Sequence, residues 1–147
     1  VTMRTMKTRI AGTLLGSALF LLASIAAAEV AIITHPGSQE IGLSKTKVAD
    51  VYMGNIKSFK DGTTAKPVDQ QKGSPLRAKF YKAILGKTET EMNRYWSKRK
   101  YTGKGKPPVV VIGDDAVKEL VANTPGAIGY IDGKSLDRSV KVILIIR

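Results

Sequence analysis

The residues with the clearest chemical potential form a glycine–serine turn at Gly73 and Ser74. Ser74 is followed by Pro75, and this order is typical of a helix start. A serine oxygen accepts from a backbone N–H that the first turn leaves unpaired, and proline has no such N–H to lose. Free N–H groups and the positive end of the helix dipole make such a start a seat for an anion. The same residues are also expected at a helix start that binds nothing, so both interpretations stay open at this point.

A second chemical feature is the basic stretch from Lys98 to Lys106, KRKYTGKGK. Its glycines leave the backbone free to wrap around an anion, and its cations could contact one directly. Tyr101 is a single aromatic residue, too little for a nucleic-acid stacking surface. A solvated, flexible loop is the alternative interpretation of this stretch.

Most catalytic chemistry is excluded by residue types. The chain has no cysteine and one histidine, which excludes thiol chemistry and the usual zinc sites with several histidines. That histidine, His35, has no recognisable serine and aspartate partners. Asp114 and Asp115 are interpreted as a helix cap and a first-turn acid. We therefore expect no enzyme, no metal site and no cofactor.

Residues 1–28 have the three parts of a secretory signal peptide. Arg4, Lys7 and Arg9 precede an uncharged, largely apolar run, and Ala26-Ala27-Ala28 offers a cleavage site before Glu29. A retained N-terminal anchor is the alternative, because the uncharged run nearly reaches the length of a bilayer span. Without cysteine there is no site for a lipid anchor. We expect a periplasmic protein that is not stably inserted in the membrane after cleavage.

Charge and length limit what residues 29–147 can be. The whole chain has 24 basic and 12 acidic residues. Three of the basic residues and none of the acidic ones lie in 1–28, so 29–147 keeps 21 and 12, a net charge of +9. A chain of this size forms one domain and lacks the length for two lobes. The positive balance favours anionic ligands or surfaces.

Strand and helix signals alternate along the chain and predict an α/β fold. Predicted strands cover 30–34, a segment at Pro67-Val68, 109–112, 127–131 and 140–146. Predicted helices begin after Ser44, after Ser74, after Thr88 in a capping box with Glu91, and at Asp114. Continuous apolar strands, including a buried one at 109–112, indicate a sheet covered on both faces. We expect a mixed sheet of about five strands with helices on both faces.

Four segments together resemble the phosphate-binding proteins of bacterial ABC transporters, as a short relative with a single periplasmic-binding-protein-like lobe. They are 48–59 (VADVYMGNIKSF), the Gly73-Ser74 turn after Pro67-Val68, Tyr95-Trp96 leading into Thr102-Gly103-Lys104-Gly105, and 125–131 (PGAIGYI). The last segment is similar to the family's P-G-A-I-G-Y-V. The resemblance implies the fold of one lobe and a solute-binding function in phosphate transport.

The resemblance also implies a phosphate site at the Gly73-Ser74 turn. Ser74 matches the family's hydroxyl donor, whereas Pro75 and Leu76 replace a glycine and a threonine. Gln70 stands at roughly the family's arginine position and Lys72 at the position of an aspartate. In the family that aspartate is implied to accept from protonated phosphate and so to reject sulfate. These differences, and the absence of a second lobe, predict weak binding.

Two classes of function follow. The first is a solute-binding protein for phosphate or a related oxyanion, working with an ABC transporter membrane component or another envelope protein. Its candidate anion contacts are Thr34, Ser38, Gln70, Lys72, Gly73, Ser74, Arg77 and Lys104. The second is an interaction module that docks an acidic protein, a sensor domain or an envelope surface, without specific nucleic-acid binding. Its candidate docking face is formed by Lys98, Arg99, Lys100 and Lys106.

Overall fold

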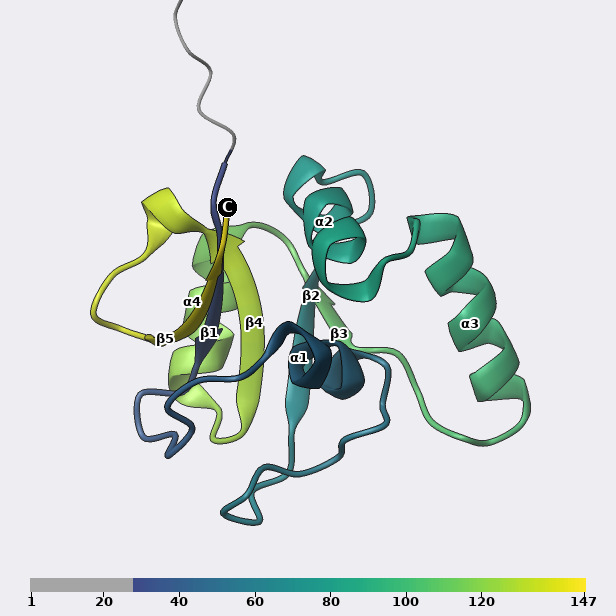
Figure 1. The fold of residues 1–147 in the computed structure, drawn as a ribbon, viewed down its shortest axis with the longest axis horizontal. Helices are drawn as coiled ribbons and strands as arrows, with labels where there is room; N and C mark the ends of the chain where they lie inside the picture. Colours follow the sequence, from purple (N-terminus) through teal and green to yellow (C-terminus); the bar gives the residue numbers. More distant parts are fainter. Residues whose placement is uncertain (1–27) are drawn as a thin grey trace, which may run out of the picture.

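A five-stranded mixed sheet forms the centre of residues 28–147, the part of the chain that the computed structural model describes (Figure 1). Its strands are β1 (Val30–Thr34), β2 (Lys66–Gln70), β3 (Val109–Val111), β4 (Ala127–Asp132) and β5 (Lys141–Ile146). They lie in the order β3-β2-β4-β1-β5. β2 runs parallel to β3 and β4, whereas β1 is antiparallel to β4 and β5. The predicted signal peptide lies outside the described residues, apart from its last residue.

The helices begin where the capping residues predict. They are α1 (Lys45–Tyr52), α2 (Pro75–Phe80), α3 (Glu89–Tyr101) and α4 (Asp114–Asn123). Ser44, Ser74 and Thr88 are the N-caps of the first three helices, and their side chains accept from the backbone N–H three residues later. Thr88 and Glu91 form the complete capping box. Short segments of other helix types are η1 (Tyr81–Leu85, a π-helix) and η2 (Gly133–Ser135).

Two apolar clusters lie on opposite faces of the sheet. On one face, α1, α2, η1 and α3 pack against a cluster that includes Val30, Ile32 and Ile128. On the other face, Val117 and Val121 of α4 pack against strand residues whose side chains point away from the first cluster, such as Ala31 and Ile33 of β1. Both faces are therefore covered, and the predicted single-lobe α/β fold with a five-stranded mixed sheet is confirmed.

Aromatic side chains fill the centre of the first cluster. The rings of Phe80 and Tyr130 are stacked with centroids 4.0 Å apart, and Tyr52 meets Phe80 edge-on at 4.7 Å. Offset and edge-on pairs of this kind add to the free energy gained by apolar burial. The stack fixes α2 over β4, and so it also fixes the start of α2 relative to the strand ends.

The prediction of a buried strand at 109–112 is wrong about burial: the strand forms, but it is exposed. β3 is an edge strand, and Val109 and Val110 are 61% and 52% exposed. The run of apolar residues is that of a central strand, but β3 has a neighbour only on its β2 side. A second correction concerns α4, where Gly113 is the N-cap and Asp114 is the first helical residue.

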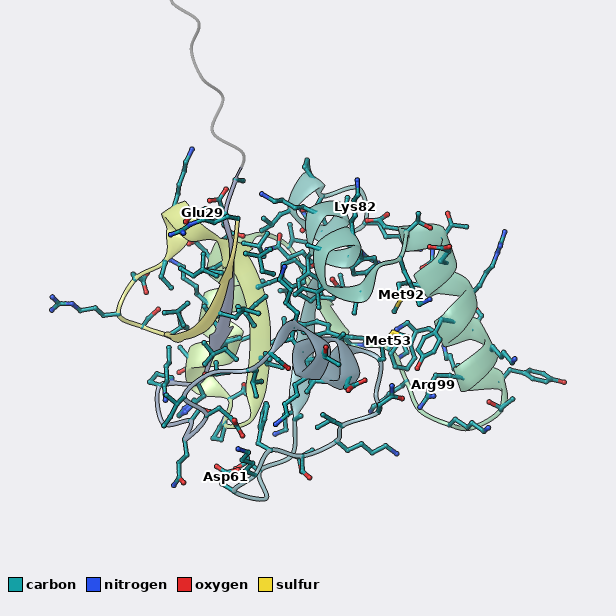
Figure 2. The ribbon with its side chains drawn as sticks, in the orientation of Figure 1. Glu29, Met53, Asp61, Lys82, Met92 and Arg99 are labelled. Atoms are coloured by element: carbon teal, nitrogen blue, oxygen red, sulfur yellow. The ribbon has the colours of Figure 1, made fainter. Side chains whose placement is uncertain are left out.

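α3 projects to one side of the sheet, and the chain from Tyr101 to Val109 returns from its far end to β3 (Figure 1). Its anchor is a small set of side chains that includes Met92, which Figure 2 shows near Met53 of the α1 end. The Tyr95 hydroxyl donates to the Met53 carbonyl oxygen at 2.6 Å. No helix within residues 28–147 is both long enough and apolar enough to cross a bilayer.

Candidate functional site

The Gly73-Ser74 turn lies where β2 ends, at the carboxyl edge of the parallel strands, as predicted. Ser74 Oγ accepts from the Arg77 N–H at 3.3 Å, which caps α2, and the Ser74 N–H donates to the Gln71 carbonyl at 3.3 Å. The Ser74 N–H is thus already paired in the turn. Among the described residues, no acceptor takes the hydroxyl proton of Ser74, which leaves this O–H as the donor that the turn can offer to a ligand.

A cavity of about 660 Å³ opens at this edge, between the starts of α2 and α4. We call it the edge cavity. Its polar lining residues include Gln70, Ser74, Lys79, Asp114, Asp115 and Asp132. Open α/β sheets bind their ligands outside the carboxyl ends of the strands, and the edge cavity occupies that position.

Gln70 is held by a network that fixes the floor of the edge cavity. Its Nε2 donates to Asp114 Oδ1 at 2.8 Å and to the Tyr130 carbonyl at 3.0 Å. Asp114 Oδ2 accepts from the Asp132 N–H at 3.1 Å and from Ser135 Oγ at 2.7 Å. Both Gln70 amide protons are therefore in use, and the predicted donation from Gln70 to an anion is absent from this arrangement.

Lys79 is the ammonium group that sequence reasoning missed. It lines the edge cavity from α2, and its Nζ is buried with no hydrogen-bond partner among the described residues. A buried ammonium without a partner is costly, and such groups are rare in folded proteins. The sequence did contain a signal for it. Lys79 follows Pro75, the first residue of α2, by four residues, so the two lie on the same face of the helix.

Arg77, the predicted cation of the site, is used inside the protein instead. Its guanidinium is buried, with Nη1 donating to the Gln70 carbonyl at 2.7 Å and Nη2 lying 3.9 Å from Asp69 Oδ2. Its Nε lies 3.3 Å from Glu89 Oε1, an ion pair without hydrogen-bond geometry. The side chain also stacks over the Tyr81 ring. Arg77 therefore lies beneath the turn and holds the strand end to α2.

Asp69 is the centre of this buried network and was also missed from the sequence. Its two carboxylate oxygens accept from the hydroxyls of Tyr81 and Tyr130. Burial, together with the neighbouring Asp69 charge, raises the pKa of both tyrosines well above the usual 10.0. A single acid between Val68 and Gln70, in a predicted strand, was the sequence signal for this cluster.

The remaining predicted contacts lie elsewhere. β1 is antiparallel to β4, so Thr34 pairs with Ile128 at the opposite edge of the sheet from Gln70. Ser38 follows Thr34 at that edge, where its Oγ accepts from the Glu40 N–H. Lys104 lines a different cavity. Lys72 and Gly73 are exposed beside the turn. The structure thus brings Gln70 and Ser74 together in the edge cavity and separates Thr34, Ser38 and Lys104 from them.

The predicted docking face lies at the end of α3. Lys98, Lys100 and Lys106 are exposed. Arg99 is half-buried, its guanidinium carbon lies 5.3 Å from the Tyr95 ring centroid, and its Nη2 donates to the Lys104 carbonyl (Figure 2). Cations in the last turn also stabilise a helix through its dipole, which is the structural reason for such residues here.

Comparison with known proteins gives matches among solved structures. No protein-family model matches the sequence, and no curated protein matches it. A phosphate ABC transporter substrate-binding protein from Clostridium perfringens, with bound phosphate, is 25% identical with a TM-score of 0.64. An ABC-type phosphate transport receptor from Vibrio cholerae is 21% identical (TM-score 0.63), and PstS from Borrelia burgdorferi is 18% identical (TM-score 0.61).

These matches cover 79% of this chain but only 44%, 45% and 46% of the three solved chains, in the same order. The chain therefore spans less than half the length of the structures that it matches. The fold of this chain is similar to part of the phosphate ABC transporter substrate-binding proteins, and the resemblance predicted from the sequence is confirmed. The first two of these neighbours are a binding protein and a transport receptor by name.

Proposed function

We propose that this protein is a solute-binding-type protein that takes phosphate or a related oxyanion in the edge cavity. The observation that carries the proposal is the Lys79 ammonium, which lies in the cavity wall with its Nζ buried and unpaired. An oxyanion at this position would pair with Lys79 and accept from the Ser74 hydroxyl. Such charge-assisted hydrogen bonds are about twice as strong as those between neutral groups.

The acidic residues of the cavity favour an oxyanion that carries a proton. Asp114 is fully engaged by Gln70, Asp132 and Ser135, whereas Asp115 is exposed beside the cavity, where its Oδ1 lies 3.5 Å from Lys118 Nζ. A carboxylate near the ligand repels a bare dianion and accepts a hydrogen bond from a protonated one. At neutral pH phosphate has such a proton and sulfate has none, so this lining favours phosphate.

Affinity is expected to be low because the cavity is open to water. Within residues 28–147 nothing closes over the cavity, and water weakens the interaction between the ligand charge and Lys79. We expect a dissociation constant of the order of 1 mM. Function in phosphate ABC transport would then depend on high local phosphate or on a transporter component that completes the site.

The cellular setting belongs to the same proposal. Residues 1–28 would direct the chain out of the cytoplasm, and residues 29–147 would act as one domain in the periplasm. The partner would be a membrane component of a phosphate transporter or another envelope protein.

Isothermal titration calorimetry with phosphate, and with sulfate as the control anion, tests the proposal. We expect saturable phosphate binding that is tighter than sulfate binding. Lys79→Gln should weaken it about tenfold or more, because a hydrogen bond to a charged group contributes about 1.5–3 kcal/mol. Lys82→Gln, at an exposed lysine of the adjoining η1, is the matched control and should change nothing. Equal binding of both anions, or no effect of Lys79→Gln, would contradict the proposal.

A second candidate function is binding of an acidic partner through the docking face defined above. It is favoured by the exposure of Lys98 and Lys100 on α3, which projects from the sheet, and of Lys106 on the loop that follows this helix (Figure 1). A docking face of this kind would bind an acidic partner and release it as salt rises, whatever the anion of the salt. Charge reversal at Lys98 and Lys100 should then abolish partner binding and leave the phosphate titration unchanged.

A further inference from the structure

A second cavity, of about 630 Å³, lies at the opposite end of β2 from the edge cavity. Its walls come from segments far apart in the sequence. Trp96 of α3, Pro108 before β3, Val68 of β2 and Leu120 of α4 all line it. Its volume is in the range of sites that hold small molecules, and its lining is predominantly apolar, as in most such sites.

The most buried residues that line this cavity have their polar groups hydrogen-bonded within the protein. Tyr52 and Val68 line it and are almost fully buried. The Tyr52 hydroxyl donates to the Val68 carbonyl at 2.7 Å and lies 3.2 Å from the Ile128 carbonyl. The polar end of Tyr52 is therefore occupied within the protein and is not available to a ligand. A ligand body at this depth would be bound by apolar contact.

The rim has the opposite character. Lys57, Lys66, Lys104 and Lys106 line the cavity from three separate segments, and none of the described residues that line it is acidic. Lysine side chains cover apolar surface with their methylene stems and keep the ammonium in water, so these four place positive charge at the mouth. We call the whole cavity the lysine-rimmed groove.

The geometry points to a binding site for a single-chain amphiphilic anion, a free carboxylate with an acyl body. The apolar floor suits the chain, and the four rim lysines suit the head group by charge complementarity. Inorganic phosphate would leave the apolar floor unused, and the volume suits one chain better than the paired chains of a membrane lipid. This site is separate from the edge cavity, so it goes beyond the oxyanion function proposed above.

Trp96 makes the test direct. It is the only tryptophan in the chain, and it forms part of the groove wall. Its fluorescence therefore reports on this site even if an amphiphile also contacts the apolar N-terminal residues. The protein is produced from the whole chain and titrated with decanoate below its micelle concentration. We expect a saturable change in Trp96 emission.

Neutral and cationic probes of equal chain length test the role of the rim. Decanol and decyltrimethylammonium should bind more weakly than decanoate. Replacing Lys104 and Lys106 together by glutamine should weaken decanoate binding about two- to thirtyfold, since exposed charge pairs contribute about 0.2–1 kcal/mol each. These lysines are exposed, so their replacement does not endanger the fold.

The matched control removes the same number of charges away from the groove, by Lys82→Gln with Lys134→Gln. Both lysines are exposed and neither lines the groove; Figure 2 shows Lys82 above Arg99, whose guanidinium lies over the Trp96 ring. The control should bind decanoate as the unaltered protein does. The inference is overturned if Trp96 does not respond to decanoate, or if the cationic probe binds equally well. It is also overturned if the Lys104 and Lys106 changes have no effect, or if an acidic strand-forming peptide changes the emission and decanoate does not.

Discussion

At the scale of single residues, the buried carboxylate of Asp69 determines how the strand end and the helices meet. The carboxylate is held by the hydroxyls of Tyr81 and Tyr130 and lies near the Arg77 guanidinium. Each partner comes from a different element, so this one side chain joins β2, α2, η1 and β4. A buried charge is tolerated because its hydrogen-bonding capacity is filled, and removal of one partner should be costly.

The first prediction is that Tyr130→Phe destabilises the protein. The change keeps the ring stacked on Phe80 but removes a hydroxyl that donates to Asp69. We expect the free energy of unfolding to fall by about 1.5–3 kcal/mol, the contribution of a hydrogen bond to a charged group. Urea denaturation measures it. Tyr101→Phe removes the hydroxyl of a residue that is 93% exposed and should leave stability unchanged. Equal effects of the two variants would refute the role given to Asp69.

The same scale shows why the predicted site was only partly found. Ser74 and Gln70 line the edge cavity because they lie where β2 ends and α2 begins. The Gly-Ser-Pro helix start makes this position predictable from the sequence. Arg77 does not, since a neighbouring acid in the strand, Asp69, draws its guanidinium into the interior. Lys79 was passed over because it lies further along the helix than the turn itself. Spacing alone could not decide which of the two cations points into the cavity.

At the scale of elements, local signals predicted the helix starts well and the environment of the strands less well. Ser44, Ser74 and Thr88 act as caps through bonds to residues three positions away, so a short stretch of sequence contains the whole signal. The exposure of β3 depends on which strands lie beside it. That information lies in β2 and β4, far along the chain, and a run of valines does not contain it.

The second prediction concerns Gly129 in the PGAIGYI segment, which lets β4 and α4 pack closely together. A Cβ on Gly129 would lie 2.6 Å from Cγ1 of Val117, so β4 and α4 approach each other too closely for any side chain there. Gly129→Ala should therefore destabilise the fold by about 1–3 kcal/mol, the usual cost of overpacking. The thermal unfolding midpoint measures it.

Gly42→Ala is the matched control for that change, because a Cβ on Gly42 would meet its nearest neighbour at 3.8 Å. It should leave the midpoint close to that of the unaltered protein. If Gly129→Ala were as harmless as Gly42→Ala, the packing account of this segment would be wrong.

At the scale of the whole molecule, the antiparallel insertion of β1 decides which residues can form one site. β1 lies between β4 and β5 and runs against both, so its last residue, Thr34, reaches the edge opposite the one where β2 and β4 end. The alternating elements predicted an α/β sheet, and the sheet was found. Strand direction is a property of the complete topology, which is why Thr34 and Ser38 were wrongly grouped with Ser74.

The third prediction is loss of stability at alkaline pH. Burial raises the pKa of Tyr52, Tyr81 and Tyr130 above the usual 10.0, so the folded protein keeps these protons after the unfolded chain has released them. Stability from this source is complete below about pH 10 and falls as pH rises beyond it, by up to about 1.4 kcal/mol per pH unit for each tyrosine.

Urea denaturation at a series of pH values between 9 and 11 measures this slope. Tyr130→Phe removes one of the three groups, and its stability should fall less steeply with pH than that of the unaltered protein. Tyr101→Phe is the control, and its slope should match the unaltered protein. A Tyr130→Phe slope identical to the control would contradict the prediction.

The most direct test of the proposed function is to map phosphate onto the folded chain by ¹H–¹⁵N NMR. We expect saturable shifts of the backbone amides near Ser74 and Lys79 and at the start of α4 from Gly113, with smaller shifts for sulfate at equal ionic strength. Shifts confined to Lys98–Lys106, or identical for both anions, would contradict the edge cavity as a phosphate site and would favour docking through the basic face.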